Sequence, residues 1–324
     1  MDLKILFQGF NDKKILIVGD SMIDAYMWGE VNRISPEAPV PVVEVKKHEN
    51  RLGGAANVAL NLKALGAKPI LCSLVGTGNR GILFKELMRE SKLSTEGILS
   101  TNKRKTTIKT RVIAENKHQL RIDEEETSPI VQVEEFLKII ISLMDDIDVI
   151  ILQDYNKGVL TNDVIEGVIA NANRKGIPTI VDPKKLNFTS YKNCTIFKPN
   201  LAEIKAGMKI DFDANNTAEI EKYTAKLRKQ LSLKGVLLTL SESGICINSE
   251  KEFKHTPAFE RNIIDVSGAG DTVISVAALC LASSIDYTNL SMLSSLAGGI
   301  VCEEVGVVPI NKEKLLIQAL KYIS

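Results

Sequence analysis

The sequence predicts an α/β protein with a mostly parallel central sheet and a smaller sheet that stands apart from it. From residue 134 onward, short apolar runs typical of buried parallel strands alternate with helical patterns. Between residues 103 and 123 the pattern changes to strict alternation, which indicates a hairpin with one apolar face. We therefore expect a single domain over residues 1–324, with a small β-sheet lid formed by two segments, about 31–47 and 104–123.

Composition excludes several classes of protein. Of the 324 residues, 44% are hydrophobic and 25% charged, which is ordinary for a globular chain with a large core. The 41 Lys and Arg residues nearly cancel the 40 Asp and Glu residues, so we expect neither a nucleic acid nor a membrane as partner. The sequence lacks signal-peptide features, long apolar runs and CxxC pairs, so we expect a cytoplasmic protein without a structural zinc site.

The first predicted strand, 14–19, ends at two acidic residues. Asp20 and Asp24 could accept hydrogen bonds from the hydroxyls of a polyol, or could be a helix cap and a surface acid. The proline-rich stretch 32–41 cannot be helical, and 42–46 is predicted as an edge strand.

A glycine pair precedes the next predicted helix. Gly53 and Gly54 would let a ligand approach the backbone closely, and Asn57 lies one turn into an Ala-rich helix that continues to Leu65. The signal is weak, because many helices begin in this way.

The predicted lid hairpin has its turn at Asn116–Lys117. Placed over the strand ends, it could direct Arg111 and Arg121 towards a ligand, although solvated hairpin charges are the other interpretation. A small sheet must also bury its apolar face, and a second subunit could cover it.

The remaining elements follow a regular alternation. The predicted strands are 69–76, 149–153, 179–182, 195–198 and 235–240, and the predicted helices include 81–93, 161–175 and 216–231. Polar residues follow strand after strand, so we expect one ligand cleft at the carboxyl edge of the sheet. Asn200 and Glu203 could hold Mg²⁺ through oxygen ligands, but the same spacing is typical of a capping box.

The stretch 265–272 combines a glycine turn with an acid at the start of a small, apolar helix. Ser267 is the predicted N-cap, and the unpaired N–H groups of the first turn would favour an anion. An acid placed beside an anion would be repelled, so we interpret Asp271 as a base that takes a proton from an attacking hydroxyl. The alternative is a glycine-rich turn with an acidic residue in the first helical turn. The sequence has neither a GxxxxGK[ST] motif nor a GxGxxG motif after the first strand, which argues against a P-loop enzyme and a Rossmann dehydrogenase.

Over nearly its full length the chain resembles the ribokinase-like (PfkB) carbohydrate kinases. Gly53–Asn57 and Asp265–Thr272 are similar to the two signatures of that family, in order and at suitable spacing. Within the family, the chain most resembles kinases of D-glycero-D-manno-heptose 7-phosphate, which serve lipopolysaccharide core synthesis. This resemblance is carried by Gly19–Asp24, Arg33–Val42, Gln153–Leu160, Val181–Lys184, Lys198–Glu203 and Thr239–Gly244. The Ser35–Pro41 run is the most specific of them.

The resemblance implies a three-layer sandwich and ATP-dependent transfer of phosphate to the anomeric hydroxyl of the sugar. In the C-terminal half, it implies that Asp271 is the base and that the N–H groups of Gly268, Ala269 and Gly270 form the anion hole. It implies that Asn200 and Glu203 position Mg²⁺ and the nucleotide phosphate, that Ser241 and Gly244 lie by the ATP phosphates, and that the segment 301–306, with Gly306, flanks adenine. Asp265 and Ser267 resemble positions that bind a monovalent cation such as K⁺.

On the sugar side, the resemblance implies that five residues grip the hydroxyls: Asp20, Asp24, Gly53, Gly54 and Asn57. Charge alone suggests that Lys157, with Arg111 or Arg121, holds the phosphate that the sugar already carries. The family resemblance also favours a homodimer through the lid.

Two positions depart from the pattern of the heptose kinases, and neither removes a catalytic group. Leu52 stands where proline is frequent, and Lys185 where glycine is frequent. Bifunctional relatives add a nucleotidyltransferase domain with a His-x-Gly-His motif, which this sequence lacks, so we expect the kinase alone. The alternatives are a kinase of another sugar, such as fructose, fructose 6-phosphate or ribose, and a catalytically silent sugar-binding regulator.

Overall fold

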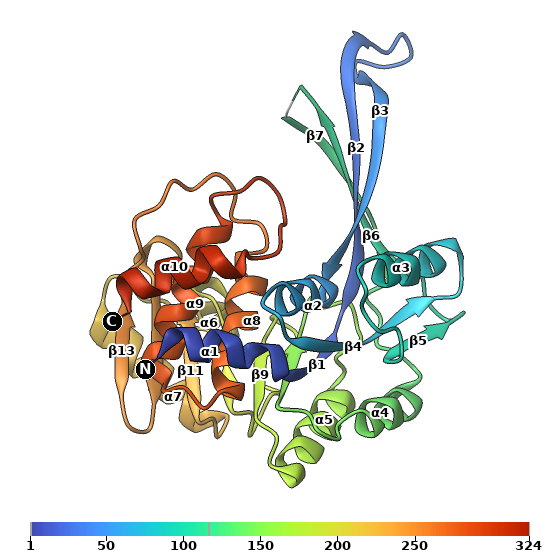
Figure 1. Ribbon diagram of the computed structural model, residues 1–324. Coiled ribbons are helices and arrows are strands. Elements are labelled where there is room, and N and C mark those ends of the chain that lie inside the picture. Colours follow the sequence, from blue (N-terminus) through green and yellow to red (C-terminus); the bar gives the residue numbers. More distant parts are fainter. Residues whose placement is uncertain (1, 116, 324) are drawn as a thin grey trace.

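A nine-stranded sheet forms the centre of the computed structural model, which describes residues 2–115 and 117–323 (Figure 1). The strand order is β13-β12-β11-β10-β9-β8-β1-β4-β5. Its strands are β1 (Lys14–Gly19), β4 (Lys68–Gly76), β5 (Ile98–Thr101), β8 (Val149–Gln153), β9 (Thr179–Asp182), β10 (Ile196–Phe197), β11 (Gly235–Thr239), β12 (Ile245–Ser249) and β13 (Phe253–Thr256). The pairs from β5 to β11 are parallel, and β12 and β13 add an antiparallel edge.

Helices cover both faces of this sheet, which is why its strands are apolar throughout. Ile15 and Ile17 of β1 pack into one core, and Leu16 and Val18 into the other. The first core is covered by α1 (Leu3–Gly9), α2 (Ala55–Ala64), α3 (Asn79–Glu90), α8 (Ala269–Ala282), α9 (Tyr287–Val301) and α10 (Lys312–Tyr322). The second is covered by α4 (Val133–Ser142), α5 (Asn162–Lys175), α6 (Leu201–Met208) and α7 (Thr217–Gln230). Short 3₁₀ helices are η1 (Phe10–Asp12) and η2 (Ser241–Ser243).

These layers confirm the predicted α/β sandwich. Among residues 2–115 and 117–323, none of the helices combines the length and the apolar character that a membrane crossing requires.

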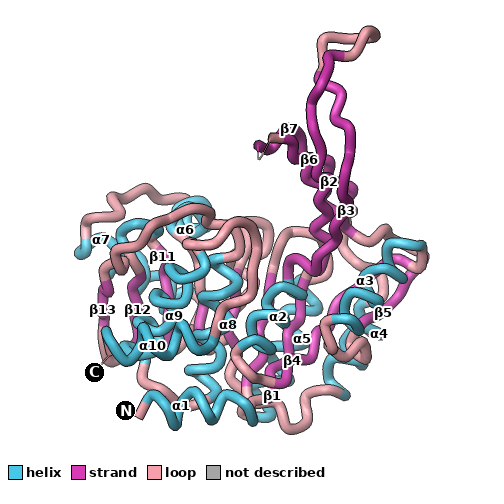
Figure 2. The backbone as a smooth tube through the Cα atoms, turned by 45° about the horizontal axis from the view of Figure 1, so that its top comes forward, coloured by secondary structure: helices cyan, strands magenta, loops and turns pink. Residues whose placement is uncertain are grey.

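A second sheet of four strands stands on the carboxyl edge of the first (Figures 1 and 2). Its order is β3-β2-β6-β7, with β2 (Ser21–Ile34), β3 (Pro41–Gly54), β6 (Thr107–Ala114) and β7 (Lys117–Glu124). We call this sheet the lid. Only Asp20 separates β1 from β2, so the lid grows directly out of a central strand. Because β3 ends at Gly54, the glycine pair links the lid to α2.

The lid strands extend beyond the predicted segments 31–47 and 104–123. A strand at 21–30 was not predicted, because the first six residues of β2 are all buried and therefore do not alternate between polar and apolar. The predicted edge strand at 42–46 lies within β3, which is indeed at the edge of the lid. Asn116, in the predicted turn, lies outside the described residues.

The far end of the lid is a two-stranded ribbon. β6 pairs with β2 only as far as Gly29, and beyond it β2 continues with β3 alone to an exposed turn at 35–40. Figure 1 shows this ribbon projecting away from the body of the protein.

Candidate active site

Polar side chains gather where neighbouring strands of the central sheet end. Asp20 follows β1, Gln153 ends β8, Asp182 ends β9 and Lys198 follows β10, and all four are buried. Asp271, in the first turn of α8, faces them from the helical layer. Buried polar groups need partners, and these residues largely provide them for one another.

Both carboxylate oxygens of Asp271 accept hydrogen bonds. Its Oδ2 accepts from Asn57 Nδ2 at 2.7 Å, and its Oδ1 accepts from the Tyr155 hydroxyl at 2.6 Å and from Gln153 Nε2 at 3.2 Å. Burial raises the pKa of the Asp271 carboxyl to about 6, and the bonds from Asn57 and Tyr155 limit that rise. A carboxyl with this pKa is mostly ionised at neutral pH and is still basic enough to accept a proton.

An ion pair lies beside the base. Lys198 Nζ is 3.1 Å from Asp182 Oδ2, and the amide of Gln153 donates to the same oxygen at 3.2 Å. A Cβ added to Gly270 would lie 3.8 Å from that oxygen and 3.9 Å from Lys198 Nζ, so both charges adjoin the glycine turn before α8.

The glycine turn differs in one respect from its prediction. Gly268, not Ser267, is the N-cap of α8, because its φ of 80° is open to glycine and unfavourable for serine. Ser267 instead donates its backbone N–H to Asp265 Oδ1 at 2.9 Å. Gly268 has no side chain with which to cap the helix. The Ala269 N–H, which was predicted to belong to the anion hole, donates to the Val266 carbonyl at 3.3 Å. The next N–H groups of α8, those of Gly270 and Asp271, are therefore the ones left for an anion.

Asp265 ties the turn to the segment that follows α9. Its Oδ2 accepts from the Gly306 N–H at 2.9 Å. Burial raises the pKa of Asp265, but the bonds from the backbone of Ser267 and Gly306 outweigh it, so the pKa lies below its ordinary value.

Asn200 and Glu203 form the capping box that their spacing allows. The Asn200 side chain accepts from the Glu203 N–H at 2.8 Å, and Glu203 Oε2 accepts from the Asn200 N–H at 2.9 Å. Glu203 Oε1 pairs with Lys184, whose Nζ also lies 3.6 Å from Asp182. Among residues 2–115 and 117–323, no group of three or more His, Cys, Asp and Glu side chains is placed to hold a metal ion. The donors present, a carboxylate and an amide oxygen, suit a hydrated Mg²⁺.

Asp20 has its carboxylate directed at the backbone after β8. It accepts the N–H groups of Tyr155, Lys157 and Val159 at 2.8–3.0 Å. Burial and the neighbouring Asp154 raise its pKa, and the three backbone bonds oppose that rise. In this arrangement Asp20 shapes the 155–159 loop.

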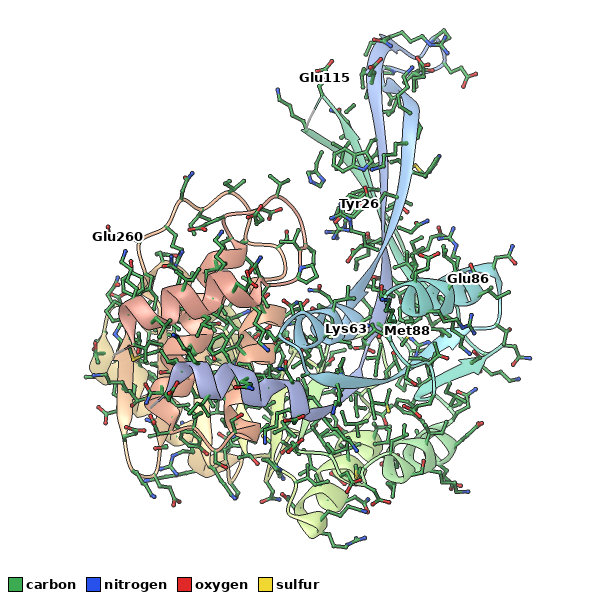
Figure 3. The ribbon with its side chains drawn as sticks, viewed as in Figure 1. Tyr26, Lys63, Glu86, Met88, Glu115 and Glu260 are labelled. Atoms are coloured by element: carbon green, nitrogen blue, oxygen red, sulfur yellow. The ribbon has the colours of Figure 1, made fainter. Side chains whose placement is uncertain are left out.

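Asp24 lies in strand β2 of the lid and pairs with Arg111. Arg111 Nη1 is 2.5 Å from Asp24 Oδ1. A Cβ at Gly53 would lie 2.2 Å from Asp24 Oδ2, so the glycine makes room for this carboxylate. The guanidinium carbons of Arg111 and Arg51 lie 5.3 and 4.8 Å from the centroid of the Tyr26 ring, and Figure 3 shows Tyr26 on the stem of the lid.

The two other predicted phosphate-binding residues lie elsewhere. Arg121 is directly opposite Arg111 in the β6–β7 ladder, but its side chain is 60% exposed and pairs with Asp123. Lys157 Nζ is 2.8 Å from Glu125 Oε2, just beyond the end of β7. The structure thus brings Arg111, but not Arg121, next to the buried acids.

A pocket lies between the lid and the C-terminal loops. Tyr26, Arg51 and Arg111 line it from the lid, and Ser267 and Gly306 line it from the body. Val307, another lining residue, would lie 3.1 Å from a Cβ at Gly268, so the pocket reaches the start of α8.

Ser241 and Gly244 belong to a different loop, at the end of β11. Ser241 has a φ of 52° and Gly244 a φ of 92°, and the Leu240 N–H donates to the Gly244 carbonyl at 2.8 Å. The loop is a tight turn at the same edge of the sheet as the buried acids.

Sequence reasoning assigned no role to five residues that complete this site: Gln153, Tyr155, Asp182, Lys184 and Lys198. Each lies at or just after the carboxyl end of a parallel strand, which is the signal that could have identified them.

The comparisons with known proteins agree with this geometry. The model of the pfkB family of carbohydrate kinases matches residues 12–314. The chain belongs to this family. It is therefore a carbohydrate kinase, a phosphotransferase that acts on a sugar.

The relatives include the bifunctional protein HldE of Desulfatibacillum aliphaticivorans, which is 40% identical over 314 residues. These cover 95% of this chain and 63% of the relative, so the chain spans less than two thirds of that protein. Two solved structures share the fold. Phosphofructokinase-2 from Escherichia coli, in complex with potassium, has a TM-score of 0.79 at 15% identity, covering 94% of this chain and 98% of its own. Arabidopsis thaliana ribokinase, complexed with ribose and ATP, has a TM-score of 0.75 at 17% identity, covering 94% and 99%.

Proposed function

We propose that this carbohydrate kinase transfers the terminal phosphate of ATP to the anomeric hydroxyl of D-glycero-D-manno-heptose 7-phosphate. The observation that carries the chemistry is the buried carboxylate of Asp271, with a pKa of about 6, in the first turn of a helix whose N-cap, Gly268, offers no side-chain cap. The heptose substrate is supported by the Ser35–Pro41 run and by the similarity to HldE.

In this mechanism Asp271 orients the sugar hydroxyl and takes its proton as the oxygen attacks the phosphate. The N–H groups of Gly268 and Gly270 stabilise the charge on the transferred group, and Lys198 lies close enough to add to their field. Asn200 and Glu203 would hold a hydrated Mg²⁺, which would neutralise charge on the nucleotide phosphates. Asp265 and Ser267 are the proposed site for K⁺, and Ser241, Gly244 and Gly306 the proposed contacts of ATP.

The sugar would lie between the lid and α8. Asn57, Asp24 and the backbone of Gly53 and Gly54 are the proposed contacts of its hydroxyls, with Asp20 shaping the adjacent loop. Of the two predicted lid arginines, Arg111 is better placed for the existing phosphate than Arg121, because Arg111 lines the pocket and is only partly exposed. Lys157 could approach the same phosphate from the 155–159 loop if its pair with Glu125 opens.

A substrate panel tests the assignment. ADP release is measured with ATP and Mg²⁺ on the heptose 7-phosphate, fructose 6-phosphate, fructose and ribose. We expect the highest kcat/KM on the heptose 7-phosphate. Absence of turnover on that sugar would end the specific claim, and ligand binding without turnover on any sugar would support a silent regulator instead.

We also propose a homodimer through the lid. The projecting ribbon of β2 and β3 has exposed apolar side chains, including Ile34 and Val45, that a second copy would cover.

A further inference from the structure

We infer that Tyr155 and Gln153 are positioning residues that fix the catalytic carboxylate, so that Oδ2 of Asp271, and not Oδ1, receives the substrate proton. The inference rests on the proposed function in one respect, namely that Asp271 is the base. Neither residue is placed here in contact with a substrate, so both act through Asp271.

The hydrogen bonds at the two oxygens are unequal. Oδ1 accepts two, from the Tyr155 hydroxyl at 2.6 Å and from Gln153 at 3.2 Å, whereas within residues 2–115 and 117–323 Oδ2 accepts one, from Asn57 at 2.7 Å. A carboxylate oxygen has two lone-pair positions, so Oδ1 is saturated and Oδ2 has one position left. That remaining position can accept the substrate hydroxyl.

The two donors on Oδ1 cannot easily change role. Burial and the neighbouring Asp271 raise the pKa of the Tyr155 hydroxyl well above its ordinary value, so it stays protonated and donates. Gln153 directs its amide nitrogen at Asp271 Oδ1 and Asp182 Oδ2, both at 3.2 Å. With two acceptors in front of it, the amide is held in the orientation that presents both hydrogens.

Charged and titratable groups surround Asp271 on several elements. Tyr155 faces it from the loop after β8, Asp182 from β9, and Lys184 and Lys198 from the segments after β9 and β10. Asp182 favours the protonated form of Asp271, and Lys198 favours the ionised form. The Tyr155 hydroxyl also favours the ionised form, so its loss should raise the pKa of the base.

The chain offers a matched control. Tyr191 is a fully buried tyrosine whose hydroxyl donates to a different buried carboxylate, Asp154 Oδ2, at 2.7 Å. Tyr191→Phe therefore removes the same kind of hydroxyl-to-carboxylate bond without touching Asp271.

The experiment compares Tyr155→Phe, Tyr191→Phe and Asp271→Asn with the unaltered enzyme. It measures kcat and KM from pH 5 to 9 at saturating ATP, with the acceptor sugar on which turnover is highest. For Tyr155→Phe we expect the acid limb of kcat/KM to move up by about one pH unit. We also expect the plateau of kcat to fall on the order of tenfold, with KM for the sugar within about twofold. Tyr191→Phe should keep the original limb.

An unmoved acid limb in folded Tyr155→Phe would overturn the inference, as would an equal shift in Tyr191→Phe. If Tyr155→Phe does not fold, Gln153→Met replaces it, because it removes the other donor to Oδ1 and should move the limb in the same direction. An unmoved limb there would likewise overturn the inference. Asp271→Asn distinguishes failure of the proposed base from failure of this inference. Near-normal turnover of Asp271→Asn would end the assignment of Asp271 as the base. An inactive Asp271→Asn, together with an unmoved acid limb in Tyr155→Phe, would end only the positioning role of Tyr155 and Gln153.

Discussion

At the scale of single residues, Asp271 combines burial with a task that requires ionisation. Its pKa of about 6 lies above the ordinary 3.8, so protonation below pH 6 removes the base. We expect kcat/KM to rise about tenfold per pH unit up to pH 6 and to level off near pH 7. ADP release between pH 4.5 and 8.5 checks this, provided that circular dichroism shows a folded protein throughout. A rate that is flat down to pH 4.5 would contradict a base with this pKa.

Replacing the base should separate activity from stability. Asp271→Asn should lower kcat by roughly two to four orders of magnitude, because general-base catalysis is lost. Since the folded-state pKa is raised, the native carboxyl binds its proton more tightly than the unfolded one, and stability decreases as pH rises from 3.8 to about 6. Asparagine has no charge to bury, so the Tm at pH 7.5 should not fall by more than a few degrees. Thermal unfolding alongside ADP release measures both, and a folded variant with near-normal turnover would disprove the assignment.

The residues that were predictable from sequence are those with a local signal. Asp271 could be placed at the site because the glycine turn, the start of the apolar helix and the acid lie within a few residues of one another. Tyr155 was not predictable, because the residue that it contacts, Asp271, lies more than a hundred positions away. Lys198 was not predictable either, because its partner Asp182 lies sixteen positions earlier in the chain. For Asp20, the position after β1 predicts a ligand contact, which stays a prediction, whereas its bonds to the backbone of 155–159 could not be foreseen.

At the scale of elements, the start of α6 allows a decisive test of Asn200 and Glu203. Glutamine can replace glutamate in a capping box, so Glu203→Gln should keep the Tm within a few degrees. It loses the charge that would attract Mg²⁺, so the Mg²⁺ concentration for half-maximal rate should rise and kcat should fall at least tenfold. Titration of Mg²⁺ in the ADP-release assay, with thermal unfolding, measures both.

The control for that test is Asn216→Ala at the start of α7. Asn216 caps its helix through the Glu219 N–H and is not among the proposed ligand contacts, so its loss should cost about 1 kcal/mol of stability and leave the Mg²⁺ dependence unchanged. If Glu203→Gln showed native Mg²⁺ dependence and native turnover, the Asn200–Glu203 pair would be a capping box alone.

Strand and helix signals differed in their value across the chain. Helices such as α5 and α7 were predictable to within a residue or two, because their caps Thr161 and Asn216 are local. The first half of β2 was not, because burial of both faces removes the alternation that identifies a strand. β10 has only two residues in the ladder, yet it lies within the strand predicted at 195–198; what was not predictable is its pairing with β9 and β11.

At the scale of the whole molecule, the layer order followed from the alternation of strands and helices, but the lid's reach did not. The sequence predicted one small sheet from two segments, about 31–47 and 104–123. It did not predict that the sheet is joined by the pairing of β2 with β6 over Met22–Gly29, because parallel pairing between distant segments leaves no local pattern.

The projecting ribbon carries the last prediction. In its register Val31 pairs with Val43, Gly29 with Val45 and Ile34 with Pro41. Pro41, Val43 and Val45 are two apart on β3, so the pleat places them on one face together with Val31 and Ile34. A two-stranded ribbon cannot bury such a face alone. A second copy of the ribbon, with the same face, is the simplest partner for it.

We therefore expect the protein to be a dimer at micromolar concentration in analytical ultracentrifugation. The double variant Ile34→Lys/Val45→Lys should shift it to monomer, because lysines on that face would be desolvated or repelled by the same residues of the other copy. Ile317→Lys, on an exposed apolar position of α10, is the matched control and should remain dimeric. A native protein that sediments only as monomer would contradict the dimer. A double variant that stays dimeric would show that the dimer interface does not include this face of the ribbon.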